Sequence, residues 1–184
     1  MERELEGREQ RHLRIQTVEG AVDGFLYTRP GTSTVHYLNV AATSQNFLTL
    51  HPPVEKPDHW EFGDGPVSIA TESIIFVVEL AEFNPKPGDP DEAARFKRAP
   101  VRVRAGSFSI DGFVFVLPGG LPVDRISHDR RPFVPMTSVS VVGRDSVFAA
   151  SFLAVNRSFV LAAQEIPHEQ PDEAPARETA TAEV

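Results

Sequence analysis

An internal repeat constrains the fold of this chain more than any other feature of its sequence. Residues 13–31 (LRIQTVEGAVDGFLYTRPG) resemble residues 101–119 (VRVRAGSFSIDGFVFVLPG) at a constant offset of 88 positions. The identical positions are Arg14, Asp23, Gly24, Phe25, Pro30 and Gly31, which recur as Arg102, Asp111, Gly112, Phe113, Pro118 and Gly119. Because self-similarity at a fixed spacing indicates repeated structural units, we expect two copies of one small unit in tandem.

Each copy continues into short apolar or alternating runs of the kind that form strands. The expected strands are 13–17, 22–27, 46–50, 67–70 and 74–80 in the first unit, and 101–105, 108–117, 133–142, 147–155 and 159–163 in the second. Gly24 and Gly112 lie at the same place inside the second strand of each unit, where a glycine indicates a bend. Five short, bent strands with almost no helix close most readily into a small SH3-like or OB-like barrel.

Composition sets the expected boundaries of these units. The first unit is 13–83 and the second 101–166, and four prolines mark 84–100 as a linker. Residues 1–12 are expected to be a flexible N-terminal arm. Residues 167–184 are rich in Pro, Glu, Ala and Thr and lack aromatic residues. Because such a composition cannot form a core, we expect a disordered acidic tail.

Several classes of protein are disfavoured by what the sequence lacks. The chain has no cysteine, so it has neither a disulfide nor a zinc site built on sulfur. Its first residues are charged throughout, unlike a signal peptide, and its longest apolar run, 74–78, is too short to span a bilayer. These features predict a cytoplasmic protein that makes no contact with a membrane.

The second unit resembles the Sm-like family of small barrels. The resemblance rests on a hairpin turn at Gly106, a second glycine at Gly112, the middle strand FVPMTSVSVV, and Asn156 at a tight turn between the last two strands. It implies barrels that associate edge to edge into rings, with strand four of one copy meeting strand five of the next. The expected fold is therefore all-β, with two tandem small five-stranded SH3-like or Sm-like barrels related by the internal repeat. A generic SH3-like barrel is the alternative.

Charge and apolar pattern together predict self-association. Residues 13–83 carry three basic and nine acidic residues, a net charge of −6, whereas 101–166 carry seven arginines and five acidic residues, a net charge of +2. The strand 107–117 is apolar on both faces near its end, so a second layer must cover its outer face. Units of like shape and opposite charge favour head-to-tail contacts. The expected interface residues are Arg102, Arg104, Phe113, Phe115, Phe25 and Tyr27.

A second set of side chains is a candidate for binding an anion or a nucleic acid. It consists of Arg125, His128, Arg130, Arg131 and Arg157, and Asp124 and Asp129 lie among them in the sequence. Basic side chains beside aromatic ones on a small barrel are a known arrangement for binding single strands. The first four lie in a loop whose polarity is equally typical of a solvated surface.

These observations favour a non-enzymatic assembly or interaction protein. We expect a homo-oligomer larger than a dimer, a ring or a filament, formed through head-to-tail contacts of the two units, with another protein as a further kind of partner. The alternative is an Sm-like nucleic-acid-binding protein that uses the arginine-rich second unit. No catalytic residue, metal ligand or cofactor is expected, because the sequence holds no P-loop, no nucleophile motif and no pair of histidines at ligand spacing.

Overall fold

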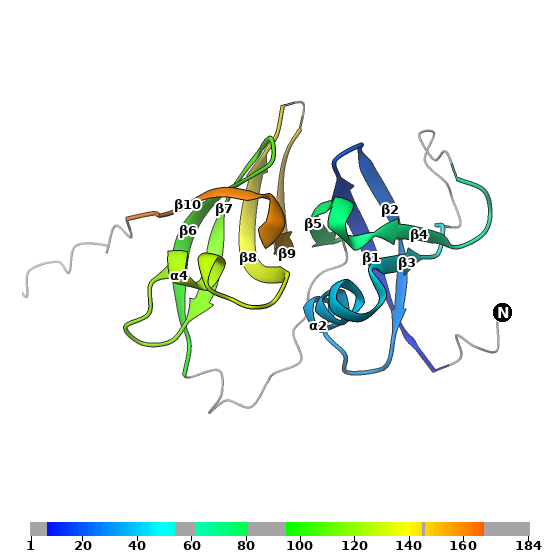
Figure 1. The fold of residues 1–184 in the computed structure, drawn as a ribbon, viewed down its shortest axis with the longest axis horizontal. Helices are drawn as coiled ribbons and strands as arrows, with labels where there is room; N and C mark the ends of the chain where they lie inside the picture. The colour runs from blue at the N-terminus through cyan, green and yellow to red at the C-terminus, as the bar shows by residue number, and fades with distance from the viewer. Residues whose placement is uncertain (1–6, 54–61, 81–94, 145, 168–184) are drawn as a thin grey trace, which may run out of the picture.

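The computed structural model describes residues 7–53, 62–80, 95–144 and 146–167. It confirms an all-β protein, with a large antiparallel sheet, a two-stranded sheet and a few short helices. The two halves of the chain lie side by side and meet at their sheets (Figure 1).

The first half contains five strands. They are β1 (Glu9–Thr17), β2 (Ala21–Thr28), β3 (Phe47–Leu50), β4 (Val67–Ala70) and β5 (Ile74–Glu79). Between β2 and β3 lies helix α2 (Thr34–Val40), which continues into a π-helical turn, η1 (Ala41–Gln45). A 3₁₀ turn, η2 (Thr71–Ser73), joins β4 to β5.

The second half follows the same order of elements. Its strands are β6 (Lys97–Ala105), β7 (Phe108–Val116), β8 (Phe133–Val142), β9 (Val147–Asn156) and β10 (Val160–Glu165). Helix α4 (Pro122–Ser127) lies between its second and third strands, as α2 does in the first half. The 3₁₀ turn η3 (Arg157–Phe159) joins β9 to β10, as η2 joins β4 to β5.

The hydrogen-bonded ladders join the two halves instead of closing each of them. The strand order of the large sheet is β10-β6-β7-β8-β9-β5-β1-β2, and β3 pairs with β4 in a separate sheet. An isolated bridge between Phe25 and His51 connects the two sheets. The two closed five-stranded barrels expected from the sequence are not seen among the described strands. The physical reason is that β5 uses its second edge to pair with β9 of the other half.

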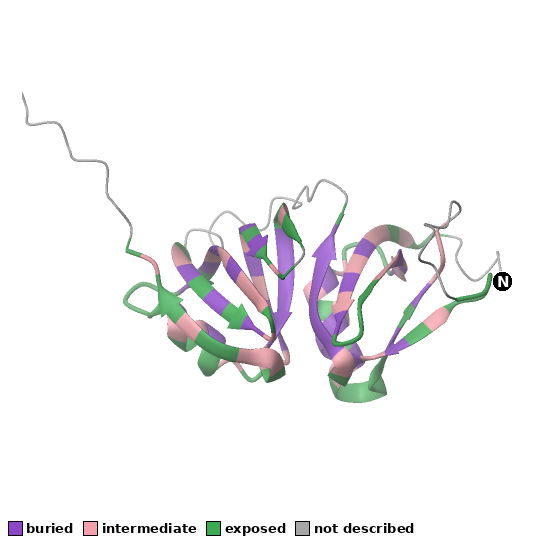
Figure 2. Ribbon diagram, turned by 90° about the horizontal axis from the view of Figure 1, so that it is seen from above, coloured by how far each residue is buried: buried purple, intermediate pink, exposed green. Residues whose placement is uncertain are grey.

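Both hydrophobic cores contain side chains from both halves. All six residues of β5 are buried, and buried residues are concentrated where the halves meet (Figure 2). Ile75, Phe76 and Val78 belong to the core of the second half, whereas Ile74 and Val77 belong to that of the first. In return, β8 and β9 contribute Phe133, Phe152 and Ala154 to the first core.

Two buried asparagines add polar links between the halves. Nδ2 of Asn39, on α2, donates to the carbonyl of Phe133 at 3.1 Å, and its Oδ1 accepts from the amide of Phe133 at 2.8 Å. At the end of β9, Nδ2 of Asn156 donates to the carbonyls of Ile74 (2.8 Å) and Thr71 (3.3 Å). Each amide therefore satisfies buried backbone groups that lie more than eighty residues away in the sequence.

Several sequence-based boundaries need correction. Residues 9–12, expected in a flexible arm, form the start of β1, and residues 97–100, expected in the linker, form the start of β6. The segment between the expected strands 108–117 and 133–142, expected to be a loop, contains α4, and α2 was not predicted at all. The remainder of the expected arm before residue 7, the last three residues of the expected first unit (81–83), most of the linker (84–94) and the tail from 168 lie outside the described residues.

Candidate assembly interface

The contact between β5 and β9 shows how one half of the chain meets the other. The strands run antiparallel, with Phe76 opposite Val155, Val77 opposite Ala154 and Val78 opposite Leu153. Counted from the first strand of its half, β5 is strand five and β9 is strand four. The Sm-like resemblance implies this same pairing of strands between neighbouring copies.

The corresponding strands of the opposite halves have unused edges. In the described part of the chain, strand four of the first half, β4, pairs only with β3, and strand five of the second half, β10, pairs only with β6. An edge with unpaired backbone groups can pair with another strand. The molecule therefore has a complementary pair of edges, β4 on the first half and β10 on the second, which are not paired with each other within the chain.

The repeat extends to irregularities in strand pairing. In β5, Ile74 pairs with Thr17 and Phe76 with Gln16, so Ile75 is an extra residue in the ladder. In β10, Val160 pairs with Ala105 and Ala162 with Arg104, so Leu161 is the corresponding extra residue. Because both strands also follow a 3₁₀ turn directly, β10 matches β5 residue for residue.

Two of the expected interface arginines lie on the exposed face of β6. Arg102 forms a two-pronged ion pair with Asp111, with distances of 2.7 and 2.6 Å. Arg14 and Asp23, their counterparts in the repeat, form the same pair at 2.8 and 2.7 Å. This repeated pair connects the first and second strands of each half. Arg104 is exposed on the same face of β6.

The expected aromatic interface residues are only partly free. The Phe25 ring lies tilted against that of His12, and Tyr27 meets His51 edge to face, with ring centroids 4.7 and 4.9 Å apart. The guanidinium of Arg98 covers Phe113 at 4.3 Å. Phe115 is 40% exposed. The sister half therefore leaves a part of the outer face of β7 uncovered.

An apolar groove that the sequence did not predict lies beside Phe115. Its volume is about 520 Å³, and its walls include Val35, Pro135 and Phe152. Arg98 lies at this groove and donates from Nη2 to Oγ of Ser138 at 3.0 Å. Ser138 has a φ of 48°, a left-handed conformation that is uncommon for a residue with a side chain.

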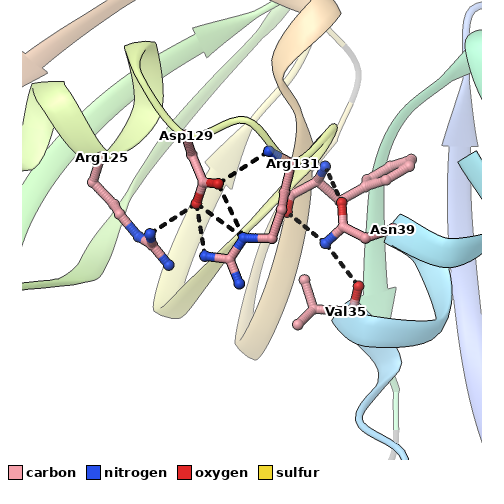
Figure 3. A network of polar contacts seen from close by, with 6 residues as sticks. Val35, Asn39, Arg125, Asp129 and Arg131 are labelled. Carbon is pink, nitrogen blue, oxygen red and sulfur yellow. Dashed lines mark hydrogen bonds and ion pairs between the residues drawn. The ribbon is translucent and has the colours of Figure 1, made fainter. Parts of the chain in front are cut away.

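The candidate anion site is partly neutralised by an acidic residue of its own. Asp129, whose side chain is 7% exposed, lies between Arg125 at 2.8 Å and Arg131 at 2.7 Å (Figure 3). Burial raises the pKa of the Asp129 carboxyl, but hydrogen bonds from Arg131 and the charge of Arg125 outweigh it. The pKa therefore lies below its ordinary value of 3.8.

The other residues of the candidate anion site are not part of this cluster of ion pairs. His128 lies 3.4 Å from Asp124, and both are exposed. Arg130 is exposed. Arg157 lies in η3, on another element, and its backbone amide donates to Pro132 at 2.8 Å. The structure therefore brings Arg125 and Arg131 together around Asp129, and Arg125, His128 and Arg130 line one hollow of about 520 Å³, whereas Arg157 is not among its lining residues.

Within the described ranges, no three His, Asp or Glu side chains are placed to hold a metal ion. No helix in the described part of the chain is long and apolar enough to cross a membrane. No protein-family model, curated protein or solved structure matches the chain.

Proposed function

We propose that this chain is a non-enzymatic assembly protein made of two small five-stranded barrels of the SH3-like or Sm-like kind. Copies associate head to tail when β10 of one chain pairs with β4 of the next. The observation that carries the proposal is the β5–β9 pairing within one chain, because it joins strand five of one half to strand four of the other. The same contact is available between chains at the two unused edges.

Strand order supports two equivalent units. The second half has the order β10-β6-β7-β8-β9, so its strands lie in the order five, one, two, three, four. The first half has β5-β1-β2 in the same order, and β3 and β4 follow through the bridge between Phe25 and His51. Because both halves have the same strand order, the pairing of strand five with strand four can form once within the chain and once between chains.

The pairing within the chain also supplies a register for the pairing between chains. Ala70 and Asn156 both directly precede a 3₁₀ turn, which aligns Ile69 with Val155. By this alignment, Ala162 of one copy lies opposite Ile69 of the next, and Ala163 lies opposite Ser68. A head-to-tail contact of this kind either closes into a ring or extends as a filament.

Charge favours the same arrangement. The first unit carries a net charge of −6 and the second +2, so contacts between unlike units are electrostatically favoured. Assembly is also favoured over the nucleic-acid alternative, because Asp129 forms ion pairs with two of the arginines on which that alternative depends, Arg125 and Arg131.

Light scattering on the purified chain tests whether it assembles. At tens of micromolar in low salt, we expect a mass of three or more chains of 20.3 kDa. High salt should weaken assembly only in part, because salt screens charges but not apolar burial. A uniform monomer would refute the proposal.

Disulfide cross-linking tests the register. The natural chain has no cysteine, so a Ser68→Cys, Ala163→Cys double variant places its only two thiols on the opposing edges. Mild oxidation should then give a ladder of covalent multimers in a denaturing gel. Each single variant serves as a control and should give no ladder, since it lacks the opposing thiol. A double variant that assembles without cross-linking would contradict the register.

A further inference from the structure

We propose that Leu161 of one copy inserts into a cavity beside β4 of the next copy. This inference rests on the proposed assembly and names the side chain that fixes the contact. Leu161 is the extra residue in the β10–β6 ladder and is 67% exposed. A large aliphatic side chain this exposed would be stabilised by packing against a second surface that excludes water.

The residue corresponding to Leu161 already makes this contact inside the chain. Ile75 is the extra residue of β5, a strand of the first half. It is 5% exposed and belongs to the core of the second half. Its Cδ1 would lie only 3.5 Å from a Cβ atom placed on Gly106. Strand five therefore contributes its extra residue to the core of the neighbouring unit.

The first half has room at the corresponding place. A cavity of about 490 Å³ opens beside β4, and its lining includes Thr17, Gly20, Val22, Phe62, Val67 and Ile69. By the offset of the repeat, Thr17 corresponds to Ala105 and Val22 to Ile110, and both of these belong to the core that holds Ile75. The cavity therefore lies where the second half receives the neighbouring strand.

A difference between the two halves explains why this space is open. The second half has Phe108 in the position of Gly20, and the Phe108 ring packs against that of Phe76 with centroids 5.0 Å apart. Gly20 contributes no side chain, and a Cβ atom placed on it would meet nothing within 4 Å. In β10, Ala162 stands in the position that Phe76 has in β5. Leu161 is therefore the large apolar side chain with which β10 of the neighbouring copy can fill the cavity.

The inference predicts how three single substitutions change self-association, measured by sedimentation equilibrium on the full chain. Leu161→Ser should weaken association by roughly 10- to 100-fold, because the contact loses the burial of one leucine side chain. Gly20→Leu should also weaken it, because the new side chain occupies the cavity from within. Leu117→Ser is the matched control, since Leu117 is 60% exposed and lies in neither of the two strands proposed to pair, β4 and β10. It should associate like the natural chain.

The possible results separate this inference from the proposed function. A natural chain that stays monomeric refutes both. A natural chain that assembles, with Leu161→Ser assembling equally tightly, overturns the insertion of Leu161 and leaves the assembly intact. Melting temperatures of the three variants show whether each is folded. A loss of association in Leu161→Ser and Gly20→Leu, both folded, with none in Leu117→Ser supports the inference.

Discussion

The carboxylate of Asp129 shows how one side chain decides the chemistry of a surface. Without it, Arg125 and Arg131 would form a strongly basic site between α4 and β8. With it, two guanidinium groups share one buried carboxylate, and Arg131 also donates its backbone amide to Asp129 at 3.0 Å. We therefore assign Asp129 a structural role: it fixes the chain between α4 and β8.

This role predicts a dependence of stability on pH. The pKa of Asp129 is lower in the folded chain than its ordinary value of 3.8. Its stabilising effect is therefore fully present above pH 3.8 and is lost as the pH falls through the folded pKa. Asp129→Asn should lower the free energy of unfolding at pH 7, and the difference from the natural chain should shrink below pH 3.8.

Urea unfolding followed by circular dichroism at a series of pH values measures this difference. Asp124→Asn is the matched control, because the Asp124 side chain is 52% exposed and lies one turn away on α4. A loss of stability in Asp129→Asn that stays constant from pH 7 to pH 2 would contradict the assignment.

At the residue scale, sequence supplied the members of this cluster but not their pairing. Arg125 lies on α4, but Asp129 lies two residues beyond the end of the helix, so helical spacing alone does not bring the two charges together. The pairing of Asp129 with Arg131 depends on the turn after α4. The repeat itself located Arg14, Asp23, Arg102 and Asp111, and their ion pairs follow once the strand register is known.

At the scale of elements, the glycine inside the second strand of each half is the clearest case where sequence predicts structure. Gly112 lies at a shift in the register between β7 and β8. A Cβ atom placed on it would lie 2.7 Å from Cγ1 of Val139 and 3.2 Å from the carbonyl of Thr137. At Gly24, the corresponding contact is 2.9 Å to the carbonyl of His51. The two glycines permit close packing onto the third strand.

Replacing the glycine of β7 should therefore be costly. Gly112→Val should lower the free energy of unfolding by about 1–3 kcal/mol, as overpacking of a core typically does. Chemical denaturation gives the value. Gly20→Ala is the control, because its added methyl group meets no atom within 4 Å. If Gly112→Val proved as stable as the natural chain, the strand would not need the bend.

The helices were harder to predict than the strands. The sequence of α2 and η1, TVHYLNVAATSQ, contains several β-branched residues, which are weak helix formers. A cap at Ser33 and the burial of Leu38 and Asn39 hold the helix in place. The burial of Asn39 is a tertiary effect, since its side chain accepts a hydrogen bond from the amide of Phe133 in the other half. No local pattern contains that information.

At the scale of the molecule, sequence predicted two related halves, but not that the fifth strand of the first half pairs with the second half. Strand five could close its own barrel or pair with a neighbour, and its apolar pattern suits either outcome. The structure shows the second outcome, with β5 paired to β1 on one edge and to β9 on the other. The two halves consequently share one sheet and exchange core residues.

This exchange predicts that the halves unfold together. Phe76 belongs to the first half by sequence, yet it is 1% exposed in the core of the second, against Phe108 and Phe148. Phe76→Ala should lower the free energy of unfolding by about 3–5 kcal/mol, as for other large core truncations. Because β5 pairs with both halves, the loss should reach amides in β1 as well as in β6 and β7.

Native-state hydrogen exchange measures that loss strand by strand. In the natural chain, the slowest amides of β1 and of β6 should share one free energy of opening, and Phe76→Ala should lower both by the same amount. Leu26→Ala serves as the comparison, since Leu26 is buried within the first core alone, and it too should lower protection in both halves if unfolding is a single event. Protection lost only in the second half after Phe76→Ala, or only in the first after Leu26→Ala, would show two independently folding units joined by a strand contact.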